Sequence, residues 1–241
     1  MNAVVVRLTV RSLLGRRRSL LLLVLPVLLI GLSVLVRVAS HAPDAPQALI
    51  GYFAMGTLLP LVCLLIGTEV IGSEIDDGSI IYLLAKPVPR RAILWSKLVV
   101  GLVTMLVFGV VPIVVGALIA SDQGRDLAVA YGLASLLAGI AYVTIFVALS
   151  VVTRSAVIIG LLYAVLWEGV LGGYVPGVRA VSVRQWALAP AQHLLGARAA
   201  TWGVASEVTL PVGIVLLVVV TVGAGWLAIA KLKTLRLATA D

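Results

Sequence analysis

The sequence predicts an all-α integral membrane protein, and three observations lead to that prediction. Hydrophobic residues make up 62% of the 241-residue chain. Charged residues make up only 12%, whereas soluble globular domains carry about 25%. Six apolar runs also meet the roughly 20-residue length that a helix needs to cross the hydrocarbon of a bilayer. We therefore expect one transmembrane domain over residues 1–241 with six spans, at about residues 19–38, 49–71, 92–120, 127–152, 156–175 and 208–230.

The segment before the first apolar run, residues 2–18, is basic and modestly amphipathic. Val4, Leu8 and Arg11 fall on one helical face, which is typical of a helix lying along a membrane surface. Because three arginines then precede the apolar run, a cleaved signal peptide is the competing interpretation. An apolar core of about 17 residues exceeds the 7–15 residues of a signal h-region. We therefore interpret residues 19–38 as the first span.

Prolines divide several of the expected spans. Pro26, Pro60 and Pro112 lie inside the first three apolar runs, where a missing N–H and a ring clash favour a kink. Residues 153–155 leave only a tight turn between the fourth and fifth spans.

Residues 176–207 are too mixed in polarity to cross a membrane. Their tryptophans, Trp186 and Trp202, favour the depth of the membrane interface. We expect short helices resting in the outer interface, broken at Pro190.

The orientation follows from Lys and Arg, which are enriched in cytoplasmic loops. Thirteen of the eighteen lie on the side that would hold both termini: Arg7, Arg11, Arg16, Arg17, Arg18, Lys86, Arg90, Arg91, Lys97, Arg154, Lys231, Lys233 and Arg236. The opposite side has Arg37, Arg125, Arg179, Arg184 and Arg198. We therefore expect a multi-pass protein of the plasma (inner) membrane with both termini cytoplasmic. The net charge of +8 is then a topology signal, and no nucleic acid is needed to explain it.

Motifs of catalysis and nucleotide binding are missing from the sequence. It contains no G-x-x-x-x-G-K-[ST] loop, no G-x-S-x-G, no H-E-x-x-H and no Cys/His cluster. Cys63 reads as a small buried hydrophobe, and neither His41 nor His193 has an obvious orienting carboxylate. We expect no catalytic residue, metal site or cofactor in this chain. An intramembrane enzyme is the rival class, disfavoured because its spans would normally carry more ionisable residues.

Two acidic residues within or at the end of spans leave alternatives open. Glu168 lies about two-thirds of the way along the fifth span, close enough to the outer surface to snorkel. It is either a substrate-pathway or ion-coupling residue, or a carboxylate facing a partner or the interface. Glu69 is a pathway charge, a span-end charge or a partner of Arg90 or Arg91.

The segment between the second and third spans, residues 72–91, is the most informative part of the chain. Ser73 followed by Asp76 is a weak capping-box signal, which would place Glu74, Asp76 and Asp77 at the positive end of a helix dipole. Pro87 and Pro89 then forbid continuation of the helix. We interpret the segment as a docking helix for a cytoplasmic partner. An ordinary solvated loop whose charges maintain topology is the alternative.

A dense pattern across this region resembles the permease subunits of the ABC type 2 exporter family. The matching residues are Glu69, Gly72, Ser73, Glu74, Gly78, Ser79, Leu83, Leu84, Ala85, Pro87, Val88, Arg90, Ile93 and Lys97. The six-span plan extends the similarity across the chain.

The resemblance implies a coupling helix that docks into a separate ATPase subunit. Carried over by position, the docking residues are Gly72, Ser73, Glu74, Asp76, Asp77, Gly78, Ser79, Tyr82, Leu83 and Leu84. Pro87, Arg90 and Lys97 would set the turn into the third span. The implied partners are two cytoplasmic ATPase subunits that bind Mg-ATP, and a second permease copy or paralogue. Members of the family move drugs, antibiotics, lipids, polysaccharides, ions or haem, so the resemblance does not fix the cargo. The short outer segment favours a drug, antibiotic, lipid or other small amphipathic molecule. A non-transporting scaffold or immunity protein remains the other alternative.

Overall fold

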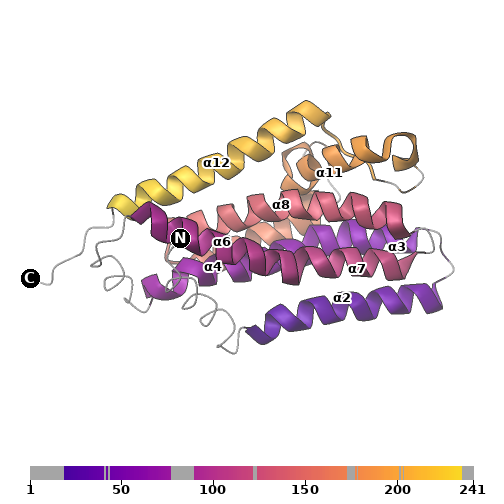
Figure 1. Ribbon diagram of the computed structural model, residues 1–241, viewed down its shortest axis with the longest axis horizontal. Helices are drawn as coiled ribbons and strands as arrows, with labels where there is room; N and C mark the ends of the chain where they lie inside the picture. Colours follow the sequence, from indigo (N-terminus) through magenta and orange to yellow (C-terminus); the bar gives the residue numbers. More distant parts are fainter. Residues whose placement is uncertain are drawn as a thin grey trace, which may run out of the picture.

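The computed structural model describes residues 19–40, 42, 44–76, 90–121, 124–172, 177, 179–200, 202 and 204–234. Within these ranges every regular element is a helix, and five helices are long and apolar enough to cross a membrane (Figure 1). The predicted class, an all-α integral membrane protein, is thereby confirmed. The interfacial helix expected at residues 2–18 and the histidine at position 41 lie outside the described residues.

The first half of the chain forms three long helical rods. Their elements in order are α2 (Ser19–Ala39), α3 (Ala45–Gln47), the π-helix η1 (Ala48–Leu58), α4 (Leu59–Asp76), α6 (Arg90–Met105), the π-helix η2 (Leu106–Val110) and α7 (Val111–Ala120). The second half contains α8 (Gly124–Val152), α9 (Ala156–Leu162), the π-helix η3 (Tyr163–Leu171), the short 3₁₀ turns η4 (Arg179–Val181) and η5 (Gly196–Ala199) on either side of α11 (Val183–Leu195), and α12 (Leu210–Thr234).

The fifth expected span is the weakest of the six in the structure. Helices α9 and η3 together form a shorter apolar helix, Ala156–Leu171. At 1.5 Å per residue, its length is below the roughly 30 Å thickness of the hydrocarbon core. A membrane crossing by this fifth expected span, and with it a total of six spans, therefore stays a prediction.

Helix α8 is the central element of the bundle. It packs against α4, α7, α11 and α12, and Figure 1 shows it between the outlying helices α2 and α12. Small residues allow the close contacts, because small side chains let helix backbones approach closely in membrane proteins. A Cβ added at Gly67 of α4 would lie 2.6 Å from the Cβ of Phe146 in α8, so only glycine fits at this crossing.

The outlying helix α12 presents an apolar face to its surroundings. Val215, Val219, Val222 and Trp226 recur at helical spacing, and each is more than half exposed. A contiguous apolar face of this kind is disfavoured in water, whereas hydrocarbon chains solvate it. This face supports the assignment of α12 as a membrane helix.

π-Helical segments lie directly before two of the three span prolines. Pro60 follows η1 and Pro112 follows η2. A helical proline lacks an N–H and clashes with the carbonyl four residues earlier, which belongs here to Gly56 or Phe108. Both carbonyls lie in the π-helical turns, whose i→i+5 pattern departs from the regular hydrogen-bond ladder. Pro26 instead lies within the α-helix α2.

The helices define two ends of the bundle (Figure 1). At the Ser19 end, α2 and α6 begin, and α4 and α12 end. The α11 end holds α3 and α11 together with the start of α12. The sites described below lie at these two ends.

Candidate functional site

The predicted coupling segment lies mostly outside the described residues. Asp77, Gly78, Ser79, Tyr82, Leu83, Leu84 and Pro87 belong to residues 77–89, which the structure does not describe. Gly72 lies in α4, Ser73, Glu74 and Asp76 form the last turn of that helix, and Arg90 is the first residue of α6. The docking role of the segment therefore stays a prediction.

The proposed helix start at Ser73 is wrong. Helix α4 runs without a break from Leu59 to Asp76, so Ser73 is an interior helical residue and cannot be an N-cap. Glu74 and Asp76 consequently lie at the C-terminal end of a helix rather than in its first turn. The dipole argument fails for these two residues, because carboxylates are favoured at helix N-termini.

Lys97 ties the third span to the second. It lies two turns into α6, is only 2% exposed, and its Nζ donates a 2.6 Å hydrogen bond to the carbonyl of Val70 in α4. Ser150 links α8 to α4 in a similar way, because its hydroxyl contacts the carbonyl of Gly67 at 3.1 Å. These contacts hold the part of α4 that leads into the undescribed segment.

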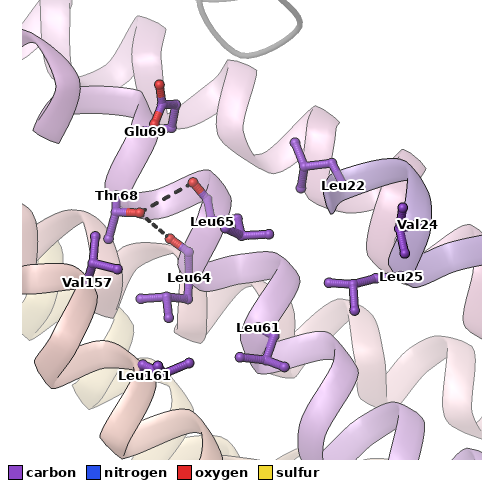
Figure 2. Close-up of a pocket in the computed structure, with 10 residues that line it drawn as sticks. All are labelled: Leu22, Val24, Leu25, Leu61, Leu64, Leu65, Thr68, Glu69, Val157 and Leu161. Atoms are coloured by element: carbon purple, nitrogen blue, oxygen red, sulfur yellow. Dashed lines mark hydrogen bonds between the residues drawn. The ribbon is translucent and has the colours of Figure 1, made fainter. Parts of the chain in front are cut away.

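A mostly apolar pocket lies between α2, α4 and α9, on the half of the bundle toward the Ser19 end (Figure 2). Its volume is about 400 Å³, within the 300–1,000 Å³ typical of ligand pockets. Its lining residues are Leu22, Val24, Leu25, Leu61, Leu64, Leu65, Thr68, Glu69, Val157 and Leu161. Glu69 is therefore placed at a pocket as well as near the end of a span. We call this space the α2–α4–α9 pocket.

Glu168 occupies a fully buried position at the α11 end. Its Oε1 accepts hydrogen bonds from the Tyr163 hydroxyl and the Val183 N–H, both at 2.9 Å. Its Oε2 accepts one from the Ser182 hydroxyl at 2.5 Å. Val183 is the first residue of α11, so this carboxylate caps a helix N-terminus, where the dipole favours negative charge. The expectation of a carboxylate snorkelling to the surface is wrong, because the side chain bonds inward to α11.

Arg184 is the second buried charge of this cluster. It is 3% exposed, and its two terminal nitrogens donate 3.1 Å hydrogen bonds to the carbonyls of Gly51 in η1 and Gly172 after η3. Its guanidinium also lies 5.3 Å from the centre of the Tyr52 ring, within range of a cation–π interaction. Arg184 thus lies at the α11 end, on the side predicted for it from the sequence, but inside the fold and not in an exposed loop.

Helix α11 is a buried helix and not a surface one. Seven of its first eight residues are buried, and the helix packs against α8 and α12. The helix continues through Pro190, so the predicted break there is wrong. A proline this deep is tolerated where neighbouring helices satisfy the freed backbone groups.

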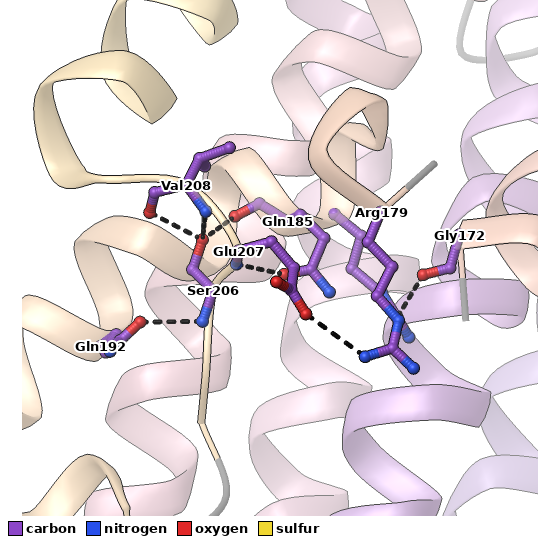
Figure 3. Close-up of polar contacts among 8 residues, drawn as sticks. Gly172, Arg179, Gln185, Gln192, Ser206, Glu207 and Val208 are labelled. Carbon is purple, nitrogen blue, oxygen red and sulfur yellow. Dashed lines mark hydrogen bonds and ion pairs between the residues drawn. The ribbon is translucent and has the colours of Figure 1, made fainter. Parts of the chain in front are cut away.

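Two glutamines of α11 accept hydrogen bonds from the segment that leads into α12 (Figure 3). Gln192 accepts a hydrogen bond from the Ser206 N–H at 2.8 Å, and Gln185 accepts one from the Glu207 N–H at 3.2 Å. An exposed ion pair, Arg179–Glu207 at 3.3 Å, lies beside them. The α11 end is thus fixed by side-chain bonds to the backbone.

Sequence reasoning missed Ser182, Arg184 and Gln185 as members of this cluster. One signal was present: a serine directly before an apolar helical run is a typical N-cap. The partner of that cap, Glu168, lies fourteen residues earlier, and no local pattern connects the two.

The described residues offer little for metal binding. No three His, Cys, Asp or Glu side chains among them come together in a way that could hold a metal ion. His193 lines a polar pocket near Glu207 at the α11 end.

Fold and sequence pattern together define a multi-pass helical membrane protein. The chain belongs to the ABC-2 family of transporters, because the sequence model described as ABC-2 family transporter protein matches residues 11–181, well over half of the chain. The resemblance drawn from residues 69–97 is thereby confirmed, and membership identifies the chain as a membrane transport permease. No curated protein matches it. Helix α11 and helix α12 lie beyond the matched range.

Proposed function

We propose that this chain is the membrane-spanning subunit of an ATP-driven exporter. Two permease chains, identical or paralogous, would form the translocation path and bind two cytoplasmic ATPase subunits. The observation that carries the proposal is the ABC-2 family match, together with the motif at residues 69–97. The export direction follows from the type 2 exporters that this motif resembles.

Energy would enter the chain through the partner. The sequence has no phosphate-binding loop of the P-loop kind, so Mg-ATP is expected in the ATPase subunit and no cofactor in this chain. Closure of the ATPase subunits would push on residues 72–91. That movement would pass into α4, which ends at the segment, and α6, which begins there. The two helices are joined by the hydrogen bond between Lys97 and Val70.

The proposed orientation places the Ser19 end in the cytoplasm of the cell. The Lys and Arg excess supports it. Arg184 and Lys97 are both buried, so leaving both out removes one charge from each side and keeps the excess on the Ser19 side. The plasma membrane is the proposed location, with both termini cytoplasmic.

The proposal is tested by purifying the tagged chain from its native membranes in mild detergent. We expect a P-loop ATPase to co-purify and the preparation to hydrolyse Mg-ATP. Reversing the charges of the segment, with Glu74→Lys, Asp76→Lys and Asp77→Lys, should release the ATPase while the permease still runs as a monodisperse species. Glu207→Lys, a charge reversal at the α11 end, is the matched control and should retain it.

The rival classes predict different results from the same preparation. A scaffold or immunity protein would bind a ligand or partner without any nucleotide dependence and without an associated ATPase. An intramembrane enzyme would show activity in the purified chain without ATP. Either result would overturn the exporter proposal.

A further inference from the structure

The α2–α4–α9 pocket has a strongly uneven distribution of polarity. Eight of its ten lining residues are Leu or Val, and the two polar ones, Thr68 and Glu69, are neighbours in α4. Leu61, eight residues earlier in α4, marks the apolar part of the same wall. Eight residues of α-helix span about 12 Å. The pocket is therefore long enough for an apolar body with a polar group at one end.

The polar end offers hydrogen-bond acceptors. The Thr68 hydroxyl donates its hydrogen to the carbonyl of Leu64 at 2.7 Å (Figure 2), so toward a ligand its oxygen can only accept. An ionised carboxylate accepts and does not donate, with about four acceptor positions on its two oxygens. Glu69 can therefore accept from a ligand alongside its other contacts. Such an end favours a cation or a donor group and disfavours an anion.

The pocket is open toward the side of the bundle. Val157 is 48% exposed, and Val24 and Leu161 are exposed to a similar degree. A molecule dissolved in the bilayer reaches this opening without passing through water. An amphiphile in the leaflet at the Ser19 end has its head near that surface and its tail toward the middle. The pocket has the same order of polarity, because Glu69 lies nearer the end of α4 than Leu61 does.

From these features we infer that the α2–α4–α9 pocket binds a lipophilic cation, its apolar body against the Leu and Val side chains and its charged head at Glu69 and Thr68. That the bound molecule is the cargo rests on the proposed function. Binding itself requires no ATPase, so the binding proposal and the exporter proposal can be refuted independently.

The test uses the full chain in nanodiscs of phosphatidylcholine, with two diazirine probes, an alkyltrimethylammonium and an uncharged alkyl alcohol of the same chain length. The ammonium probe should label peptides of α2, α4 and α9. Decyltrimethylammonium should compete with it and decyl sulfate should not. Labelling equally suppressed by both competitors, or spread over α12, would mean unspecific lipid-like binding and would overturn the inference.

Two pairs of variants locate the site. Glu69→Gln should weaken labelling by the ammonium probe about tenfold, because the quaternary head loses its Coulombic attraction to the carboxylate, and leave the alcohol probe unchanged. Glu207→Gln makes the same chemical change at the other end and should alter neither. An unchanged ammonium affinity in Glu69→Gln would refute the role of the carboxylate.

The second pair tests the apolar wall. Val157→Trp should fill the pocket and abolish labelling by both probes. Ile158→Trp is the control, because this neighbour is 64% exposed and does not line the pocket. Both substitutions lie at exposed positions, so both variants should fold. Equal labelling in the two variants would place the probe elsewhere.

Discussion

At the scale of single residues, Glu168 and Arg184 form the buried polar centre of the α11 end. Glu168 receives three hydrogen bonds, one of them from the backbone of α11. Arg184 reaches from α11 to carbonyls of two other segments. A buried charge is tolerated only when it is paired or well hydrogen-bonded. Their contacts therefore define how α11 sits in the bundle, and both residues should be sensitive to substitution.

Arg184→Gln should destabilise the protein strongly. The shorter amide cannot span the carbonyls of Gly51 and Gly172, and two hydrogen bonds from a charged donor contribute about 3 kcal/mol or more. Arg198→Gln is the control, because Arg198 makes an exposed ion pair with Asp126, worth less than about 1 kcal/mol. Thermal unfolding of the purified chain, followed by tryptophan fluorescence, should show a much larger decrease for Arg184→Gln. Equal decreases in unfolding temperature for the two variants would contradict the role of Arg184 in holding α11 in the bundle.

Glu168→Gln should loosen the start of α11. An amide keeps the shape of the side chain but loses the charge, so its bonds to Tyr163, Ser182 and Val183 weaken by about 1–2 kcal/mol in total. Hydrogen exchange at the Val183 amide should become faster, while exchange in the middle of α8 should stay unchanged. The alternative role, a carboxylate needed only for ion coupling, predicts no change in exchange at Val183.

The positions of these residues illustrate what sequence can predict at this scale. The ionisable side chain at position 168 was recognisable inside an apolar run, because charges there are rare. Its surroundings were not, since Ser182 and Val183 belong to another segment and approach it only in the folded bundle. Residue type indicated that the position matters, whereas tertiary contacts determine what it does.

At the scale of elements, glycines set the distance between α4 and α8. Gly67→Ala should destabilise the bundle by about 1–3 kcal/mol, the usual effect of overpacking, because the new Cβ meets Phe146 and the Val147 backbone. Gly31→Ala in α2 meets nothing within 4 Å and should be neutral or slightly stabilising, since alanine favours helix. Gly67→Ala should lower the unfolding temperature of the protein, whereas Gly31→Ala should leave it unchanged or raise it slightly. A neutral Gly67→Ala would contradict the close α4–α8 contact.

Apolar runs were sufficient to predict the rods but insufficient to predict their internal structure. The long windows identified α2, α4, α8 and α12, because crossing hydrocarbon requires continuous apolar helix. The wrong helix start at Ser73 and the wrong break at Pro190 share one cause. Local cap and breaker signals were overridden by neighbouring helices, which stabilise a continuing helix through packing. The π-helices had no signal apart from the prolines that follow η1 and η2.

At the scale of the whole molecule, the two ends of the bundle have different properties. The α11 end is held by buried charges and by glutamine–backbone bonds. The Ser19 end carries the laterally open α2–α4–α9 pocket and the helix termini that flank residues 77–89. Helix α4 connects the pocket to that segment, so a push on the segment reaches the pocket wall directly. This arrangement suits a permease whose ATPase acts at the Ser19 end.

The family could be recognised from sequence because its motif is local, whereas the pocket could not. The motif occupies one continuous stretch, residues 69–97. The pocket combines Leu22, Leu61 and Val157 from three helices, and no pattern in the chain brings these positions together before the fold is known.

The central claim is that residues 72–91 dock onto an ATPase subunit, and site-specific photocross-linking tests it most directly. A photoreactive amino acid at position 82, in place of Tyr82, should cross-link the chain to a cytoplasmic P-loop ATPase in native membranes. The same amino acid in place of Trp226, on the exposed face of α12, should not. A cross-link to an ATPase from position 82 alone is the predicted result. Absence of any ATPase adduct from position 82, with the permease correctly inserted and abundant, would contradict the account.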